Sequence, residues 1–186
     1  MLLSLPAGAQ AKDVAPSGPG DDCTRCHDAW QGAPVVHAPI ALGLCAACHA
    51  STSATEHTFA TPTDTAASCR LCHAAPAAGV ATHAPTREGL CLTCHAPHAS
   101  KFAALLRASD EDTCRGCHLN ASAGRHVVAG FVYGDWHPVR GRPDPRARGG
   151  ALTCSSCHAP HAAPTRQLYR FEVKGKEALC RTCHPM

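Results

Sequence analysis

The sequence contains few large apolar side chains, although its overall composition suggests otherwise. Residues classed as hydrophobic make up 45% of the 186-residue chain, but 35 of them are Ala and 14 are Cys. Leu, Ile, Val and Phe together account for only 28 of the 186 residues, a share more typical of disordered chains. Aromatic residues are scarce as well, at 4%. An ordinary core of packed side chains is therefore excluded as the main source of stability.

Long hydrophobic runs and extended regular elements are also disfavoured. No segment approaches the roughly 20 consecutive apolar residues that a membrane-spanning helix needs, so no transmembrane segment is expected. The chain has 15 Pro and 15 Gly, which shorten helices and strands because Pro lacks a backbone donor and Gly loses more entropy on folding. The interior must therefore be filled by something other than side chains.

The cysteines indicate what fills it. All 14 Cys lie in seven copies of one pentapeptide, Cys-x-x-Cys-His. Two thiols at this spacing can add to the two vinyl groups of one haem, and the following His is then placed at the iron. Disulfides or zinc sites would not need a His after every second Cys. The predicted attachment sites of seven haems c are Cys23, Cys26, Cys45, Cys48, Cys69, Cys72, Cys91, Cys94, Cys114, Cys117, Cys154, Cys157, Cys180 and Cys183.

The histidines match the haems in number. The predicted proximal ligands are the seven motif residues His27, His49, His73, His95, His118, His158 and His184. The spare residues are His37, His57, His83, His98, His126, His137 and His161. A single spare His is more often a solvated or hydrogen-bonding residue than a ligand. Because the counts are equal and the only Met residues are terminal, we expect two imidazoles on each iron.

The positions of the spare His suggest how they are distributed. Every gap between consecutive motifs holds at least one, so each iron is expected to take its second ligand from a neighbouring gap. This gap rule assigns haems one to seven, in order, to His37, His57, His83, His98, His126, His137 and His161. The alternative is a fixed relation to the following haem, because His37 and His83 each stand eight residues before a Cys. A ligand donated by another subunit is a further alternative.

The motifs belong to a repeat that resembles a known family. HAPIALGLCAACHA (37–50) and HAPTREGLCLTCHAPH (83–98) are copies of one unit, and CHAPHAS (94–100) recurs as CHAPHAA (157–163). Over about residues 23–186 these stretches resemble the doubled C-x-x-C-H family of multihaem c-type cytochromes. The resemblance implies stacked haem pairs wrapped by irregular chain, in proteins that carry electrons for anaerobic or extracellular respiration. It also implies axial roles for the seven motif His and for His37, His83, His98, His137 and His161.

The expected fold is a multihaem cytochrome c, with mostly irregular chain and short α-helices around a stack of seven haems. Residues 1–11 resemble a signal-peptide remnant and 12–22 a flexible segment, which leaves 23–186 as one heptahaem domain. Short helices are expected at the motifs and over 100–108, and residues 168–173 are expected to pair with 127–133 in one small hairpin.

The longest gap between motifs carries the remaining features. The Arg- and Gly-rich stretch 140–150 is expected to be a solvated loop without compact structure, or alternatively a docking surface for an acidic partner or a haem propionate. Tyr133 and Trp136 are expected to pack on a porphyrin face.

Electron transfer is the expected function, because an iron capped by two imidazoles has no open position for a substrate. The chain is therefore not expected to be an enzyme, and its expected partners are redox proteins. Haem attachment at such motifs follows export, which predicts a periplasmic or extracellular location. The formal charge of +3 falls to about −4 with 14 propionates and seven ferric irons, so nucleic-acid binding is not expected.

Two other functions are kept as alternatives. One is a subunit of a polymeric extracellular filament that associates through terminal haems, since the chain ends two residues after His184. The other is a multihaem reductase, which would need one iron with an open sixth position.

Overall fold

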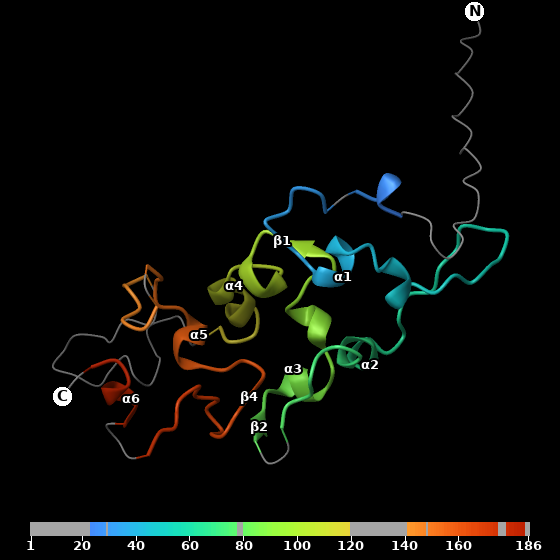
Figure 1. The fold of residues 1–186 in the computed structure, drawn as a ribbon. Helices are drawn as coiled ribbons and strands as arrows, with labels where there is room; N and C mark the ends of the chain where they lie inside the picture. The colour runs from blue at the N-terminus through green and yellow to red at the C-terminus, as the bar shows by residue number, and fades with distance from the viewer. Residues whose placement is uncertain are drawn as a thin grey trace, which may run out of the picture. The chain divides into compact units, whose positions relative to one another are not determined.

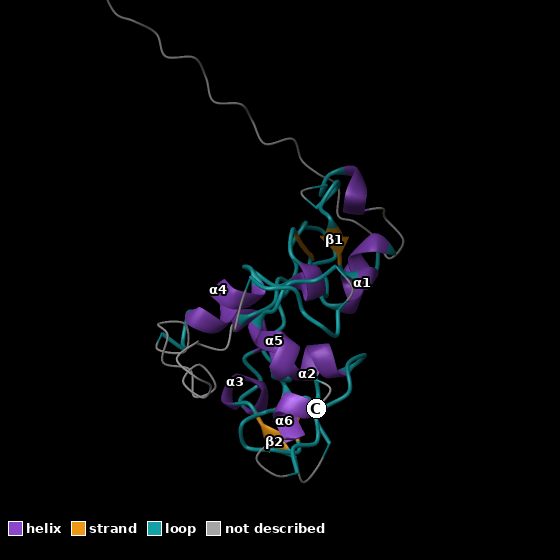
Figure 2. Ribbon diagram, turned by 90° about the vertical axis from the view of Figure 1, so that its left-hand side faces the viewer, coloured by secondary structure: helices purple, strands orange, loops and turns teal. Residues whose placement is uncertain are grey.

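A computed structural model describes residues 23–28, 30–77, 80–119, 141–147, 149–174 and 178–184 (Figure 1). These residues form short helices joined by irregular chain, as the content of Pro and Gly predicts (Figure 2). The α-helices are α1 (Ala38–Ala41), α2 (Thr65–Arg70), α3 (Ala84–Arg87), α4 (Asp110–Arg115), α5 (Cys154–Cys157) and α6 (Ala178–Arg181). The 3₁₀ helices are η1 (Cys23–Arg25), η2 (Cys45–Ala47), η3 (Cys91–Thr93) and η4 (Ala103–Leu105).

The chain divides into two compact units. The first consists of Met1–Ala29 and Ala38–Thr63, and the second of Trp30–His37 and Asp64–Met186. Among the described elements, η1, α1 and η2 belong to the first unit, and the remaining helices and the strands belong to the second.

The described strands form two small antiparallel sheets, both in the second unit. Strand β1 (Val35–Val36) pairs with β3 (Ala99–Ser100), and β2 (Ala81–Thr82) pairs with β4 (Ala162–Ala163). Figure 1 shows β2 and β4 side by side although they are far apart in the sequence. Each sheet therefore joins a strand that precedes a spare His to a strand formed by the last two residues of a repeated stretch, CHAPHAS (94–100) or CHAPHAA (157–163).

Two expected elements differ from the structure. Residues 167–174 form no strand, and Tyr169 makes only one isolated bridge, with His158, while 127–133 lies outside the described residues. Of the helix expected over 100–108 only the short η4 forms. It cannot continue because Ala104 (φ 53°) and Leu105 (φ 56°) adopt left-handed backbone conformations.

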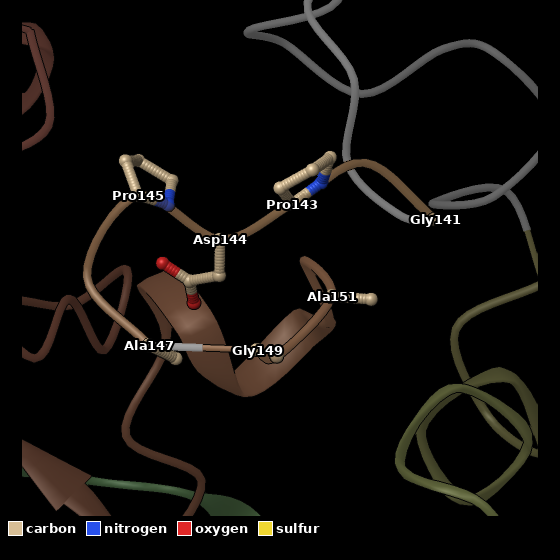
Figure 3. A pocket seen from close by; sticks show the side chains of 8 residues that line it. Gly141, Pro143, Asp144, Pro145, Ala147, Gly149 and Ala151 are labelled. Carbon is tan, nitrogen blue, oxygen red and sulfur yellow. The ribbon is translucent and has the colours of Figure 1, made fainter.

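The Arg-rich stretch also differs, because its described part folds into a closed loop. The N–H of Gly141 donates to Leu152, and the N–H of Asp144 donates to Gly150, at 3.2 and 2.9 Å. Figure 3 shows the Asp144 carboxyl group inside this loop, where it accepts a 2.8 Å hydrogen bond from the N–H of Arg146. Hydrogen bonds from Ser156 and Arg146 hold the pKa of Asp144 below its ordinary value. The expectation of a stretch without compact structure is thus wrong for these residues.

The described residues bury almost no apolar side chains. Ile40 and Ala163 are the only buried hydrophobic residues among them, at 9% and 4% exposure, and no side chain is fully buried. Large apolar side chains within or beside the motifs are instead open to solvent, such as Leu71 at 76% and Leu119 at 74%. The side chains of these described segments therefore do not form the core that normally stabilises a chain of this length.

Candidate metal centres

All seven Cys-x-x-Cys-His motifs share one local structure. Four begin a helical turn with their first Cys (η1, η2, η3 and α5), and in the other three α2, α4 or α6 contains the first Cys. In every motif, including those of His49 and His184, the His N–H donates to the carbonyl of the first Cys at 2.8–3.1 Å. This bond closes one helical turn and brings the His to the same face as the first Cys. The prediction of short helices at the motifs is confirmed.

Among the described residues, four motif His rings lie opposite a spare His ring. The ring centres are 5.8–6.0 Å apart and the planes lie within 35° of each other. The pairs are His27–His57 in the first unit, and His73–His37, His118–His83 and His95–His161 in the second. Two imidazoles that bind one metal ion from opposite sides, through bonds of about 2.0 Å, have ring centres roughly 6 Å apart. The geometry therefore suits one metal ion between each pair of rings.

These pairs overturn the gap rule. It assigned His37, His57, His83 and His161 to haems one, two, three and seven, whereas the structure places their rings opposite the motif His of haems three, one, five and four. A fixed relation to the next haem is wrong as well, because His37 and His83 each face the second motif that follows them. The two copies of the repeated unit therefore share one relation, but it is to the second motif that follows and not to the first.

Backbone carbonyls orient several of the rings. The Nδ1 atom of His37 lies 2.9 Å from the Pro97 carbonyl oxygen, and Nδ1 of His95 lies 2.8 Å from that of Ala104. A carbonyl group can only accept, so each Nδ1 carries the proton and the lone pair is on Nε2. This is the tautomer that binds a metal through Nε2 while its second nitrogen is held in place.

The fourth and sixth motifs are supported by copies of one loop. In both, a Leu with positive φ follows the residue whose carbonyl reaches the motif imidazole: Leu105 (φ 56°) follows Ala104, and Leu168 (φ 57°) follows Gln167. Gln167 accepts from Nδ1 of His158 at 2.7 Å, as Ala104 does from His95. The copied CHAPHA stretch is visible in the sequence, but these two contacts are not, because a backbone carbonyl has no residue-type signal.

Neighbouring motifs of the second unit approach each other through their second cysteines. Burial, together with the nearby Cys117, raises the pKa of Cys94. Burial, together with the nearby Cys183, raises the pKa of Cys157 in the same way. The fourth motif therefore lies beside the fifth, and the sixth beside the seventh.

The fifth and sixth motifs meet at Asp110. Ligand-type atoms of Asp110, Cys114 and Cys154 all lie within 4.8 Å of one another, where α4 packs against α5. Burial, reinforced by Cys154 and Asp110, raises the pKa of Cys114 to about 12. The N–H and the hydroxyl of Ser155 donate to the Asp110 carboxylate. Because both thiols belong to Cys-x-x-Cys-His motifs, this cluster is a junction between two motifs and not a separate metal site.

Two further His rings lie beside aromatic side chains. The ring of His98 lies 5.7 Å from that of Trp30, tilted by 48°. The ring of His158 lies 5.4 Å from that of Tyr169 and nearly parallel to it. The predicted residues that fall outside the described part of the chain are His126, His137, Tyr133 and Trp136.

These residues fit covalently bound haem c. Each motif offers two thiols and one imidazole, and a second imidazole lies at the distance required of a metal ligand in the four pairs. Leu44 and Leu90, which directly precede a motif, are 52% and 51% exposed and are available to cover a flat apolar group. Such a group would supply the interior that the side chains lack.

Comparison with known proteins agrees with haem attachment at these motifs. A family model described as the doubled CXXCH motif matches residues 83–123 and 144–186, which contain motifs four to seven. Neither the curated proteins nor the solved structures include a match. None of the helices in the described part of the chain is long and apolar enough to span a membrane.

Proposed function

Since the chain belongs to the doubled CXXCH family of multihaem c-type cytochromes, we propose that it carries electrons through seven haems c, each bound by two cysteines and two histidines. Proteins of this family transfer electrons and are generally exported. The observation that carries the finer proposal is the repeated approach of a motif His to a spare His at 5.8–6.0 Å, in both units. Haem iron held in this way alternates between the ferric and ferrous states and carries one electron.

The residues of each motif divide the work of holding the group. The two thiols form thioether bonds, which attach the group permanently to the backbone. The motif His supplies one nitrogen ligand, and its position is set by the hydrogen bond that closes the helical turn. In the four ring pairs the second nitrogen comes from His57, His37, His83 or His161. With both axial positions filled by protein, no position remains for a substrate, which favours a carrier over a reductase.

The backbone tunes these ligands. A carbonyl that accepts from Nδ1 increases the electron density that Nε2 donates to a metal, and this stabilises the oxidised metal. His37, His95 and His158 have such carbonyl partners at 2.7–2.9 Å. The same contacts stop the rings from rotating, so the ligand geometry changes little when the charge on the metal changes.

The proposed setting is the periplasm or the cell surface, in anaerobic or extracellular respiration, with other redox proteins as donor and acceptor. With 14 propionates and seven ferric irons the polypeptide charge of +3 becomes about −4, which favours partners with a basic docking surface.

Two measurements on the mature protein test the proposal. Intact-mass spectrometry counts the covalent haems, and electron paramagnetic resonance of the oxidised protein shows the spin state of each. We expect seven haems, all low-spin, because two imidazoles give a strong ligand field. A count below seven, or a high-spin signal equivalent to one haem or more, would refute the heptahaem carrier and revive the reductase.

A further inference from the structure

Each small sheet ends in two His residues that face each other across its strands. The N–H of His83 donates to the His161 carbonyl at 3.0 Å, and the N–H of His37 donates to the His98 carbonyl at 2.9 Å. His83 and His37 come one position after β2 and β1, and His161 and His98 come one position before β4 and β3, in the same register. In both sheets the spare His residues are therefore cross-strand partners.

Cross-strand partners have a fixed spacing. Their Cβ atoms lie about 4.5–5.5 Å apart, and their side chains leave the same face of the sheet. In the β2–β4 sheet the two rings nevertheless serve different motifs. His83 lies opposite His118 of the fifth motif at 6.0 Å, and His161 lies opposite His95 of the fourth motif at 5.8 Å.

The surroundings of this sheet agree with a fixed pair. Motifs four and five are already neighbours, since Cys94 lies near Cys117. Ala163, which pairs with Ala81 in the sheet, is the most buried hydrophobic residue in the described part of the chain, at 4% exposure. The strand that follows His161 is therefore packed against other parts of the chain.

Building on the proposed function, we propose that the β2–β4 sheet is a clamp that holds the fourth and fifth metal centres at one separation. It does so because their second ligands, His161 and His83, are a single cross-strand pair. The β1–β3 sheet has the same kind of cross-strand His pair, in which His37 lies opposite His73 of the third motif and is bonded to His98 through the backbone. A register shift by one residue would turn both ligands of a clamp to the other face at once.

The clamp makes a prediction that separate ligands would not. Antiparallel strands alternate hydrogen-bonded and non-hydrogen-bonded pairs, so the His83–His161 bond makes Ala81–Ala163 the next hydrogen-bonded pair and leaves the Ala162 N–H directed away from β2. Ala163→Pro therefore removes a ladder bond and disturbs the clamp. Ala162→Pro is the matched control, because it removes a donor that the ladder does not use.

Carbon monoxide provides the readout, because it binds ferrous haem that has lost its sixth protein ligand. In the reduced holoprotein, His83→Ala and His161→Ala should each bind about one carbon monoxide per molecule. Ala163→Pro should bind about two, although it removes no ligand, and Ala162→Pro should bind none. If Ala163→Pro binds one or none, the clamp is refuted while the ligand pairs stand. If the two His variants bind none, the ligation in the proposed function fails instead.

A milder variant covers the case in which Ala163→Pro does not accumulate as holoprotein. Ala163→Gly keeps the N–H and weakens the strand through its greater backbone freedom. Stopped-flow mixing of the reduced protein with carbon monoxide should then show faster binding at two haems, with one common rate. Acceleration at a single haem would overturn the clamp.

Discussion

Asp110 is predicted to secure the junction between the fifth and sixth motifs, and its replacement tests that junction. Asp110 begins α4, and its carboxylate accepts from the hydroxyl and, at 3.4 Å, from the N–H of Ser155 in α5. Asp110→Ala leaves both donors without this partner in a half-buried position. An unsatisfied buried donor costs about 1–3 kcal/mol, and the longer N–H contact adds little. We therefore expect the free energy of unfolding to fall by about 2 kcal/mol.

The control for this prediction lies one residue away. Glu111 also contributes a negative charge to the first turn of α4, and it forms an ion pair with Arg115 at 3.5 Å on a partly exposed face. Such a pair contributes about 0.3–0.5 kcal/mol, so Glu111→Ala should cost less than Asp110→Ala by more than 1 kcal/mol. The charge lost from the helix is the same in both variants and cancels in the comparison.

Guanidinium denaturation of the oxidised holoprotein, followed by circular dichroism in the Soret region, measures both variants. Asp110→Asn should fall between Asp110→Ala and the parent, because the amide keeps one oxygen that can accept from Ser155. The reasoning is refuted if Asp110→Ala and Glu111→Ala lower the denaturation midpoint equally, since the Ser155 contacts would then add nothing.

Three further predictions concern other parts of the chain. His57→Ala should convert one haem to high spin in electron paramagnetic resonance, because the His57 ring lies 5.9 Å from that of His27; no change would contradict the pair. Gly89→Ala should lower the free energy of unfolding by about 1–3 kcal/mol, because Gly89 has φ +75° and a Cβ there would lie 2.7 Å from that of Ala66 in α2. The control is Gly116→Ala, where a Cβ would meet ordinary contacts from 3.5 Å, and it should cost under about 1 kcal/mol in the same denaturation assay. The pKa of Asp144 is lowered from 3.8, so its charged form stabilises the 141–152 loop above pH 3.8, and this stabilisation is lost as the pH falls through the lowered pKa. Hydrogen exchange at the Arg146 amide, which donates to Asp144, should become faster in that pH range. Unchanged exchange would exclude the contact.

The parts of the site that could be predicted from the sequence are those that depend only on consecutive residues. The thiol spacing, the adjacent His and the turn that joins them depend only on five consecutive positions, and the structure forms this turn in all seven motifs. The lack of a core of large apolar side chains could be predicted as well, since the count of such residues does not depend on the fold. The domain boundaries and the number of haems stay predictions.

The pairing of His rings could not be predicted, because it depends on contacts between distant backbone segments. The β strands that place His37 and His83 contain only two residues each, too few for a periodic pattern. The loop at 141–152 was missed for a related reason. It is closed by the Asp144 carboxylate and by positive φ at Gly141 and Gly149, which composition alone reads as open chain. Residues 168–173 alternate like a strand, but Leu168, with φ 57°, directs that segment toward the sixth motif.

The second unit combines two kinds of order. Motifs that follow one another along the chain are also neighbours in space. The third and fourth meet where α2 packs on η3, and the fifth and sixth where α4 packs on α5. The fourth and fifth meet near Cys94 and Cys117, and the sixth and seventh near Cys157 and Cys183. The spare His rings do not follow this order, because His37 and His83 each face the second motif that follows them and His161 faces the fourth motif, which precedes it. Chain order alone would leave each motif attached only to the next. The ring pairs place the third, fourth and fifth motifs opposite His residues that adjoin β1, β4 and β2, so separating the fourth motif from the fifth also requires parting a His pair or the β2–β4 sheet.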